Sequence, residues 1–407
     1  MNRKPQQLIT SIIGRFKPGI WIISLIALLN WVSWSMSLPF MTLYLYKERG
    51  VSMAWVGVIV LVCGLVSVVT QLAGGTITDR IGRRPFLLGT VALGILLYLL
   101  MAGLIGANAP LLAVVAAFAV VRAVLTMQRP AIQAIVADLA PPERLAESYS
   151  LLRVCTNIGF AAGPALGGVL IIYLNYAWLF GLAGLIGILT LILLTIFLKE
   201  SSERRSLKIP FTGILAAGKD RDLLIFTLVS LLVFMTMGQL GSTVSVYTVS
   251  YAGFSEAQYG ILLSLNGLII VAVQYPLTRV LGRFPYLSLA LGCLLYGIGY
   301  LTFSWVGPFG LGALAITVLT FGEMIFSPAS STLVGQLASS DWRGRYMAFY
   351  GAAETLGYSV GPLLGGLLLN AFPQHPLVVW GSLSSLAFMA AIIFSRVRFK
   401  NIVNQGN

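Results

Sequence analysis

The chain has 407 residues, of which 58% are apolar and only 10% are charged, and its formal net charge is +13. Soluble domains carry about 25% charged residues, so this composition excludes a soluble globular fold and indicates that lipid surrounds most of the chain. The basic excess falls in short loops between apolar runs, which is typical of cytoplasmic membrane loops and argues against nucleic acid as a partner.

Twelve apolar runs divide the chain, each long enough to cross a bilayer as a helix. The first six are 19–46, 53–77, 86–106, 110–137, 146–173 and 176–198. A polar segment follows at 199–222, and the other six runs are 223–251, 257–278, 285–305, 310–337, 346–370 and 376–395. We therefore predict an all-α membrane protein with 12 transmembrane helices in two pseudo-symmetric six-helix bundles, at 1–198 and 223–407, joined by a cytoplasmic linker at 199–222.

The distribution of basic residues predicts the orientation of the chain. If the N-terminus lies in the cytoplasm, the external loops hold only Lys47 and Arg49 among the loop cations. Both termini are therefore expected to be cytoplasmic. The first apolar run is too long for a cleaved signal peptide and is expected to remain as a span. The single histidine, His375, has no second histidine with which to form a metal site.

The two halves of the sequence resemble each other at an offset of 198 residues. Pro130-Ala131 in the fourth run recurs as Pro328-Ala329 in the tenth. A glycine pattern in the fifth run also recurs in the eleventh; its members in the fifth run are Gly159, Gly163, Pro164, Gly167 and Gly168. Such a duplication is typical of transporters built from two repeated halves, with the binding site near the membrane midplane between them.

The loop after the second run carries a second compact motif. It reads Gly75-x3-Asp79-Arg80-x-Gly82-Arg83-Arg84. A glycine in the helix permits close helix approach, and a glycine in the loop suits a sharp turn. This pattern resembles the signature of the major facilitator superfamily, and the glycine pattern of the fifth run resembles its antiporter motif. The resemblance covers essentially the whole chain and implies the major facilitator fold.

Within that superfamily the chain most resembles the twelve-span drug/proton antiporter branch. Gly322-Glu323-x4-Pro328 is similar to a segment of bacterial multidrug exporters whose glutamate takes part in proton coupling, which implies that role for Glu323. The usual R-x-x-Q-G of the fourth span reads here from Arg122 to Thr126 and keeps only the arginine. Asn30 stands where several relatives place an acidic residue.

Ionisable residues inside the membrane cost at least about 2.5–3.5 kcal/mol each and are functional by default. Arg122, Thr126, Arg129 and Gln133 share one helix face by their spacing. The predicted proton-coupling residues are Glu323, Arg122 and Glu354. The predicted substrate-cavity residues are Asn30, Trp34, Thr126, Arg129, Gln133, Gln239 and Ser327. The predicted conformational latch consists of Gly75, Asp79, Arg80, Gly82, Arg83, Arg84 and Asp138. Arg129 and Arg153 either face the cavity or extend to the membrane interface.

These features predict a secondary transporter, and no nucleophile–base pair, metal cluster or phosphate loop points to an enzyme. The favoured hypothesis is proton-coupled efflux of lipophilic or cationic compounds by alternating access, driven by the proton gradient without a cofactor. An exporter of anionic or amphiphilic metabolites that uses the cavity arginines is the alternative, and a non-transporting membrane receptor is a remote one. A multi-pass monomer in the bacterial inner membrane is expected, with a small-molecule substrate and membrane lipid as partners.

Overall fold

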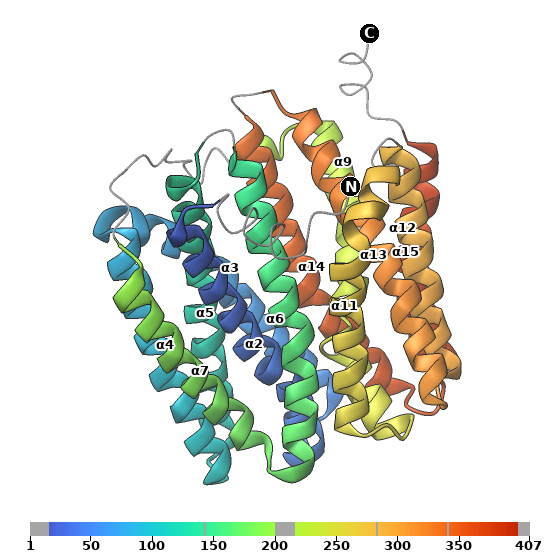
Figure 1. Ribbon diagram of the computed structural model, residues 1–407. Coiled ribbons are helices and arrows are strands. Elements are labelled where there is room, and N and C mark those ends of the chain that lie inside the picture. The colour runs from blue at the N-terminus through green and yellow to red at the C-terminus, as the bar shows by residue number, and fades with distance from the viewer. Residues whose placement is uncertain (1–15, 142–143, 200–215, 282–283, 340–341, 398–407) are drawn as a thin grey trace, which may run out of the picture. The chain divides into compact units, whose positions relative to one another are not determined.

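The computed structural model describes residues 16–141, 144–199, 216–281, 284–339 and 342–397, and in these ranges all regular structure is helical (Figure 1). The first half contains α2 (Pro18–Leu43), the π-helical turn η1 (Tyr44–Glu48), α3 (Met53–Ile81), α4 (Arg83–Gly106), α5 (Leu111–Leu139), α6 (Leu145–Tyr173) and α7 (Tyr176–Phe197). The second half contains α9 (Arg221–Met237), α10 (Thr243–Val246), the π-helical turn η3 (Tyr247–Tyr251), α11 (Glu256–Leu281), α12 (Pro285–Thr302), η4 (Phe303–Trp305), α13 (Phe309–Leu337), α14 (Arg343–Ala371) and α15 (Pro376–Arg396).

Every predicted apolar run contains a helix, which confirms the all-α membrane fold. In the described residues, ten helices are long and apolar enough to cross a membrane by themselves. The other two are the seventh run, which the structure divides into shorter helical pieces, and the eleventh run, which forms the glycine-rich helix α14. The placement of both termini in the cytoplasm stays a prediction.

The seventh apolar run predicted one continuous helix, but the structure divides it into two helical pieces. Helix α9 ends at Met237, and α10 begins at Thr243 after a short turn. Gln239 in this turn donates from Nε2 to the carbonyl oxygens of Met235 (2.9 Å) and Gly361 (2.7 Å). Its Oε1 accepts from Thr243 Oγ1 at 2.6 Å. The buried amide of Gln239 thus satisfies backbone groups at the helix break.

The helices group into two compact units, which interleave along the chain. The first comprises Met1–Ser37, Val69–Gly163 and Tyr173–Ser206, and the second comprises Leu38–Val68, Pro164–Ile172 and Leu207–Asn407. Helices α2, α3 and α6 therefore each contribute residues to both units. The two units are defined by contacts between residues and not by the internal repeat of the sequence. The division into repeat halves at 1–198, 199–222 and 223–407 stays a prediction.

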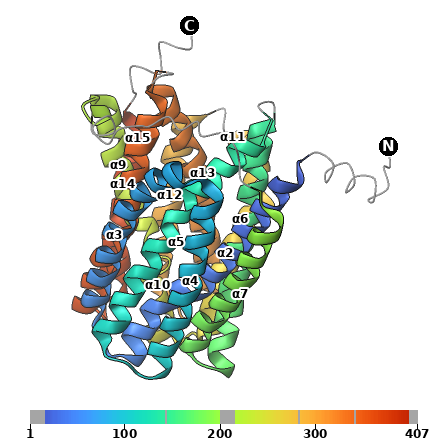
Figure 2. The same cartoon turned by 90° about the vertical axis from the view of Figure 1, so that its left-hand side faces the viewer.

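The first unit has an apolar core contributed by five helices, α2, α4, α5, α6 and α7, which are labelled in Figure 2. Its buried members are Ile23, Ile26 and Ala27 of α2, Phe86 and Leu87 of α4, Ala131, Ile132, Ile135 and Val136 of α5, Leu152 of α6, and Leu194 of α7, with Leu198 just beyond α7. Packing of this kind fixes α5, the helix that carries several of the predicted cavity residues.

Within the first unit, the glycine pattern of α6 brings that helix onto α2. A methyl group at Gly159 would lie 2.5 Å from the Leu28 carbonyl oxygen, and one at Gly163 would lie 2.7 Å from that of Val32. Both glycines therefore allow backbone contact that no other residue would permit.

The repeated pattern in α14 does the same within the second unit. A methyl group at Gly357 would lie 3.1 Å from the Phe234 carbonyl carbon, and one at Gly361 would lie 2.9 Å from that of Met235, both on α9. The last glycines of the two patterns pack on the starts of other helices, Gly168 on α11 at Glu256 and Gly366 on α3 at Met53. The duplicated motif is thus used for equivalent close contacts in both copies.

We expect Gly366→Ala to lower the unfolding temperature in detergent, whereas Gly351→Ala on the same helix should leave it unchanged or raise it slightly. A methyl group at residue 366 meets the backbone of Met53, which cannot move aside as a side chain would; one at residue 351 meets nothing within 4 Å. Overpacking typically costs about 1–3 kcal/mol, while Gly→Ala in an open helical position gains up to about 1 kcal/mol. Equal shifts for the two variants would contradict the proposed contact.

Candidate functional site

Glu323 lies on α13 within the second unit and is partly buried. Asn266 of α11 donates from Nδ2 to Glu323 Oε2 at 3.3 Å and to Thr320 Oγ1 at 2.8 Å. The side chains of Asn266 and Thr320 are only 1% and 0% exposed. A carboxylate in a membrane helix is therefore held by a buried amide from a neighbouring helix, which is a specific environment for an ionisable group.

Helix α12 forms a second wall of this site because glycines let it approach α13 closely. A methyl group at Gly322, the residue before Glu323, would lie 2.9 Å from the carbonyl oxygen of Gly292. Tyr296 and Tyr300 of α12 are buried and interact electrostatically with Glu323. The acidic side chain thus accepts a hydrogen bond from α11 and interacts electrostatically with two buried tyrosines of α12.

A proline shapes α13 just after Glu323. Pro328 has no backbone N–H, so the carbonyl of Met324, four residues earlier, loses its helical partner. Gln274 of α11 replaces that partner, donating from Nε2 to the Met324 oxygen at 3.0 Å. Helix α11 therefore binds α13 at two places, through Asn266 and through Gln274.

The first unit contains a different polar pair at a small pocket. Asn30 of α2 donates from Nδ2 to Gln128 Oε1 of α5 at 3.2 Å. Both residues line the pocket, together with Ser33, Val91, Gly94, Ile95, Tyr98, Leu125, Ala183 and Gly187. The pocket places Asn30, a predicted cavity residue, beside Gln128, which sequence reasoning missed.

The internal repeat of the sequence also extends into the third and ninth spans. Leu93-Gly94-x-Leu96-Leu97-Tyr98 of α4 recurs, shifted by 198 residues, as Leu291-Gly292-x-Leu294-Leu295-Tyr296 of α12. Both glycines face the helix that follows: Gly94 lies against α5 at Leu125 and Gln128, and Gly292 against α13 at Phe326. Both tyrosines are buried. The tyrosine beside Glu323 thus has a counterpart beside the Asn30–Gln128 pair.

The predicted polar face of α5 does not form one buried cluster. Arg122 is partly buried with its guanidinium 5.9 Å from the Phe118 ring centroid, and Thr126 bonds the Arg122 carbonyl oxygen of its own helix at 2.7 Å. Arg129 and Gln133 are exposed, and the Arg129 guanidinium lies 5.9 Å from the Trp31 ring centroid. Trp31 in turn packs on Trp34, with ring centroids 5.2 Å apart.

The remaining predicted cavity and coupling residues have mixed environments. Ser327 is partly buried one turn after Glu323 on α13, and Gln239 is fully buried with its amide bound as described above. Glu354 is exposed on α14 and interacts electrostatically with Tyr350. Arg153 is exposed on α6. Their roles in coupling or substrate binding stay predictions.

Part of the predicted latch forms an ion pair in the first unit. Arg83 Nη1 pairs with Asp138 Oδ2 and also donates to the Ala134 carbonyl oxygen at 2.6 Å, so α4 is tied to the end of α5. Arg84 donates to the Thr195 carbonyl oxygen at 2.9 Å, while Arg80 is exposed. Gly82 has a φ of 98°, as its turn role predicts. The surroundings of Gly75 and the Asp79 side chain lie outside what the structure describes.

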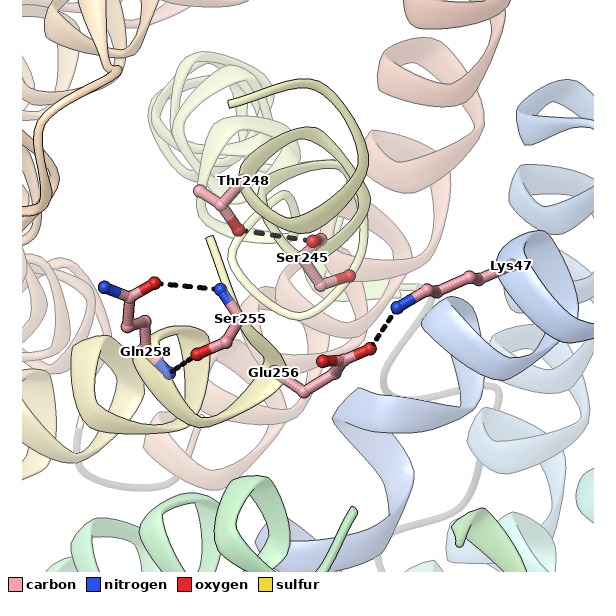
Figure 3. A network of polar contacts seen from close by, with 6 residues as sticks. All are labelled: Lys47, Ser245, Thr248, Ser255, Glu256 and Gln258. Carbon is pink, nitrogen blue, oxygen red and sulfur yellow. Dashed lines mark hydrogen bonds and ion pairs between the residues drawn. The ribbon is translucent and has the colours of Figure 1, made fainter. Parts of the chain in front are cut away.

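A second ion pair occurs at the end of the second unit where η1, η3 and the start of α11 meet. Lys47 pairs with Glu256, which lies 209 residues away in the sequence (Figure 3). Nearby, Tyr46 and Tyr251 share a hydrogen bond between their hydroxyl groups at 2.6 Å, and Thr42 Oγ1 lies 2.9 Å from Ser245 Oγ.

The start of α11 is fixed locally as well. The Ser255 backbone N–H donates to Gln258 Oε1 at 2.9 Å, and the Gln258 N–H donates to Ser255 Oγ at 3.2 Å, a reciprocal cap of the helix (Figure 3). This cap holds Glu256 in place opposite Lys47. The sequence predicted that Lys47 lies in an external loop, but it gave no indication that Glu256 is its ion-pair partner.

A family model of the Major Facilitator Superfamily matches residues 23–325 and 250–406 of this chain. The chain belongs to the Major Facilitator Superfamily. The motif resemblance noted in the sequence is thereby confirmed, and the chain is a multi-pass membrane protein and a secondary transporter. At the level of the family, membership of this superfamily supports a protein that is not an enzyme.

Several known proteins are similar to this chain along most of their length. The chain is 26% identical over 367 residues to a Na(+), Li(+), K(+)/H(+) antiporter of Planococcus maritimus, covering 81% of this chain and 85% of that protein. It is 21% identical over 377 residues to the quinolone resistance protein NorA of Staphylococcus aureus strain MSSA476, covering 89% and 93%. These relatives agree with the drug/proton antiporter type that the motifs indicate.

A solved transporter structure supports the same fold. A POT family transporter in complex with a thioalcohol-conjugated peptide matches with a TM-score of 0.77 at 15% identity, covering 93% of this chain and 95% of that one.

Proposed function

We propose that this member of the superfamily exports lipophilic or cationic compounds across the bacterial inner membrane in exchange for protons. The observation that carries the proposal is Glu323, a partly buried carboxylate of a membrane helix held by Asn266 and lying near Tyr296 and Tyr300. Ionisable residues at such positions mark proton and ion pathways in transporters. A relative that exchanges alkali cations for protons and a relative named for quinolone resistance support antiport and efflux, respectively.

In the proposed cycle, a proton and the substrate compete for one site. A proton entering from outside neutralises Glu323 and releases the substrate, and loss of the proton inside restores the anion, which attracts a cationic substrate. The membrane potential adds about 2.3 kcal/mol per charge moved at 100 mV. The proton gradient, together with this potential, is then the driving force, no cofactor takes part, and a monomer is the functional unit.

A second candidate substrate class is supported by the arginines of α5. Arg122 is partly buried beside Phe118, and Arg129 lies over Trp31, so both cations are presented next to aromatic rings. Such a pair suits an anionic or amphiphilic substrate. Replacing Arg122 by Ala should then abolish transport of an anion such as carboxyfluorescein and leave transport of ethidium unchanged.

The proposal is tested with purified protein in liposomes that contain the pH indicator pyranine. An imposed pH gradient should drive ethidium movement against its concentration gradient, and added ethidium should move protons in the opposite direction. Ethidium transport that ignores the pH gradient would refute proton coupling. Liposomes that move neither probe, nor any member of a broad panel of compounds, would favour a non-transporting receptor instead.

A further inference from the structure

We propose that Asn266 is a positioning residue that couples the protonation state of Glu323 to helix α11. The inference rests on the proton-coupled transport proposed above and assigns a role to a residue that the motifs of the sequence do not mark. Asn266 and Glu323 lie 57 residues apart and on different helices of the second unit. Their contact is therefore a link between the acidic group and a neighbouring span.

Thr320 determines which end of the Asn266 amide faces Glu323. The Thr320 hydroxyl donates its single proton to the Ile316 carbonyl oxygen, at 2.6 Å. Its oxygen can then only accept from Asn266, so the amide must present its NH2 group on this side. The second proton of that NH2 group is directed to Glu323 Oε2. Asn266 is thereby committed as a donor to the carboxyl group.

A committed donor responds to the charge of its acceptor. A hydrogen bond to a carboxylate is charge-assisted and roughly twice as strong as a bond to a neutral acceptor. Protonation of Glu323 therefore weakens the Asn266 contact. The protonated carboxyl group keeps an oxygen that can accept from the buried amide, but this neutral bond is weaker than the charge-assisted one. Protonation therefore loosens the link between α11 and α13 at Asn266 and makes movement of α11 relative to α13 easier.

The second link between these helices does not depend on protonation. Gln274 bonds the Met324 carbonyl oxygen that Pro328 leaves without a helical partner. This neutral bond is present whether Glu323 carries a proton or not. The Gln274 bond thus keeps α11 attached to α13 in both protonation states. The Asn266–Glu323 bond, eight residues earlier on α11, is the one whose strength changes.

Among the described residues, helix α12 brings three other titratable side chains to this site, Tyr296, Tyr300 and the thiol of Cys293, which interacts with Tyr296. All three are buried, and both tyrosines interact electrostatically with Glu323. They are neutral in the physiological range, so they do not supply the change of charge that Asn266 would sense. The carboxyl group of Glu323 is the one that gains and loses a proton in this scheme.

The experiment compares two activities of the reconstituted protein, ethidium transport driven by a pH gradient and ethidium counterflow at equal pH. Asn266→Leu should slow pH-driven transport by about tenfold or more, the effect of one charge-assisted hydrogen bond, and leave counterflow within about twofold. Thr320→Val should act in the same direction, because the freed amide can turn its oxygen toward Glu323. Thr320→Ser should restore the wild-type ratio of the two activities. Thr317→Val, whose hydroxyl bonds only its own helix at Ala313, is the matched control.

A spectroscopic readout separates this role from simple support of the fold. The infrared band of the protonated Glu323 carboxyl group, identified by its absence from Glu323→Gln, should move to higher frequency in Asn266→Leu and in Thr320→Val, since the carboxyl oxygen loses a donor. An unchanged band together with undiminished pH-driven transport in both variants would overturn the inference. If Glu323→Gln keeps full proton coupling, the proposed function itself is contradicted. If Glu323→Gln loses coupling while the Asn266 and Thr320 variants keep it, the proposed function stands and the proposed role of Asn266 is contradicted.

Discussion

Oxidation of a variant with cysteines at positions 42 and 245 should stop transport almost completely. Thr42 Oγ1 and Ser245 Oγ are 2.9 Å apart, so sulfur atoms placed there can reach the disulfide distance of about 2.05 Å with a small adjustment. The bridge would join the end of α2 to α10 beside the Lys47–Glu256 pair. Alternating access needs one end of the transporter to open during each cycle, so a covalent link there should reduce ethidium transport to below about a tenth of the reduced protein's rate.

The controls for this variant are available within the chain. Cys63 and Cys293 are buried, whereas Cys155 is partly exposed and should be replaced by serine in the background. The single variants Thr42→Cys and Ser245→Cys should keep their transport after oxidation, and dithiothreitol should restore it in the double variant. Full transport by the cross-linked protein would show that this end of the second unit does not open during the cycle.

Glu323→Gln should abolish pH-driven ethidium efflux while the protein still inserts and folds. Glutamine preserves the size of the side chain and can still accept from Asn266, but it cannot bind or release a proton. Ethidium counterflow at equal pH, which needs no net proton movement, should therefore survive. Everted membrane vesicles with pyranine and ethidium measure both activities in one preparation.

Replacing a different glutamate by glutamine shows whether the loss of coupling is specific to the carboxyl group of Glu323. Glu147 lies exposed in the first turn of α6, and Glu147→Gln should keep wild-type coupling. Ethidium accumulation that responds to the pH gradient equally in Glu323→Gln and in the wild type would remove Glu323 from the mechanism.

The sequence alone determined the membrane fold because the signals for it are local. Crossing a bilayer requires about 20 consecutive apolar residues, and the twelve runs can be read one at a time. The turn glycine at Gly82 is equally local, and the duplication is found by comparing two stretches of sequence 198 residues apart, without knowledge of any contact in space. Glu323 could be chosen because a carboxylate inside an apolar run is costly wherever the helix lies.

Amides, by contrast, escaped sequence reasoning because they carry no charge. Asn266 and Gln128 stand within apolar runs, and only packing reveals that one holds Glu323 and the other holds Asn30. The break after Met237 was hidden for a similar reason, since the run stays apolar and the turn is completed by a bond from Gln239 to Gly361 of α14. The tertiary structure decided these features, because each depends on which side chains meet through space, whereas hydropathy and spacing report only on the residue and its neighbours in the chain.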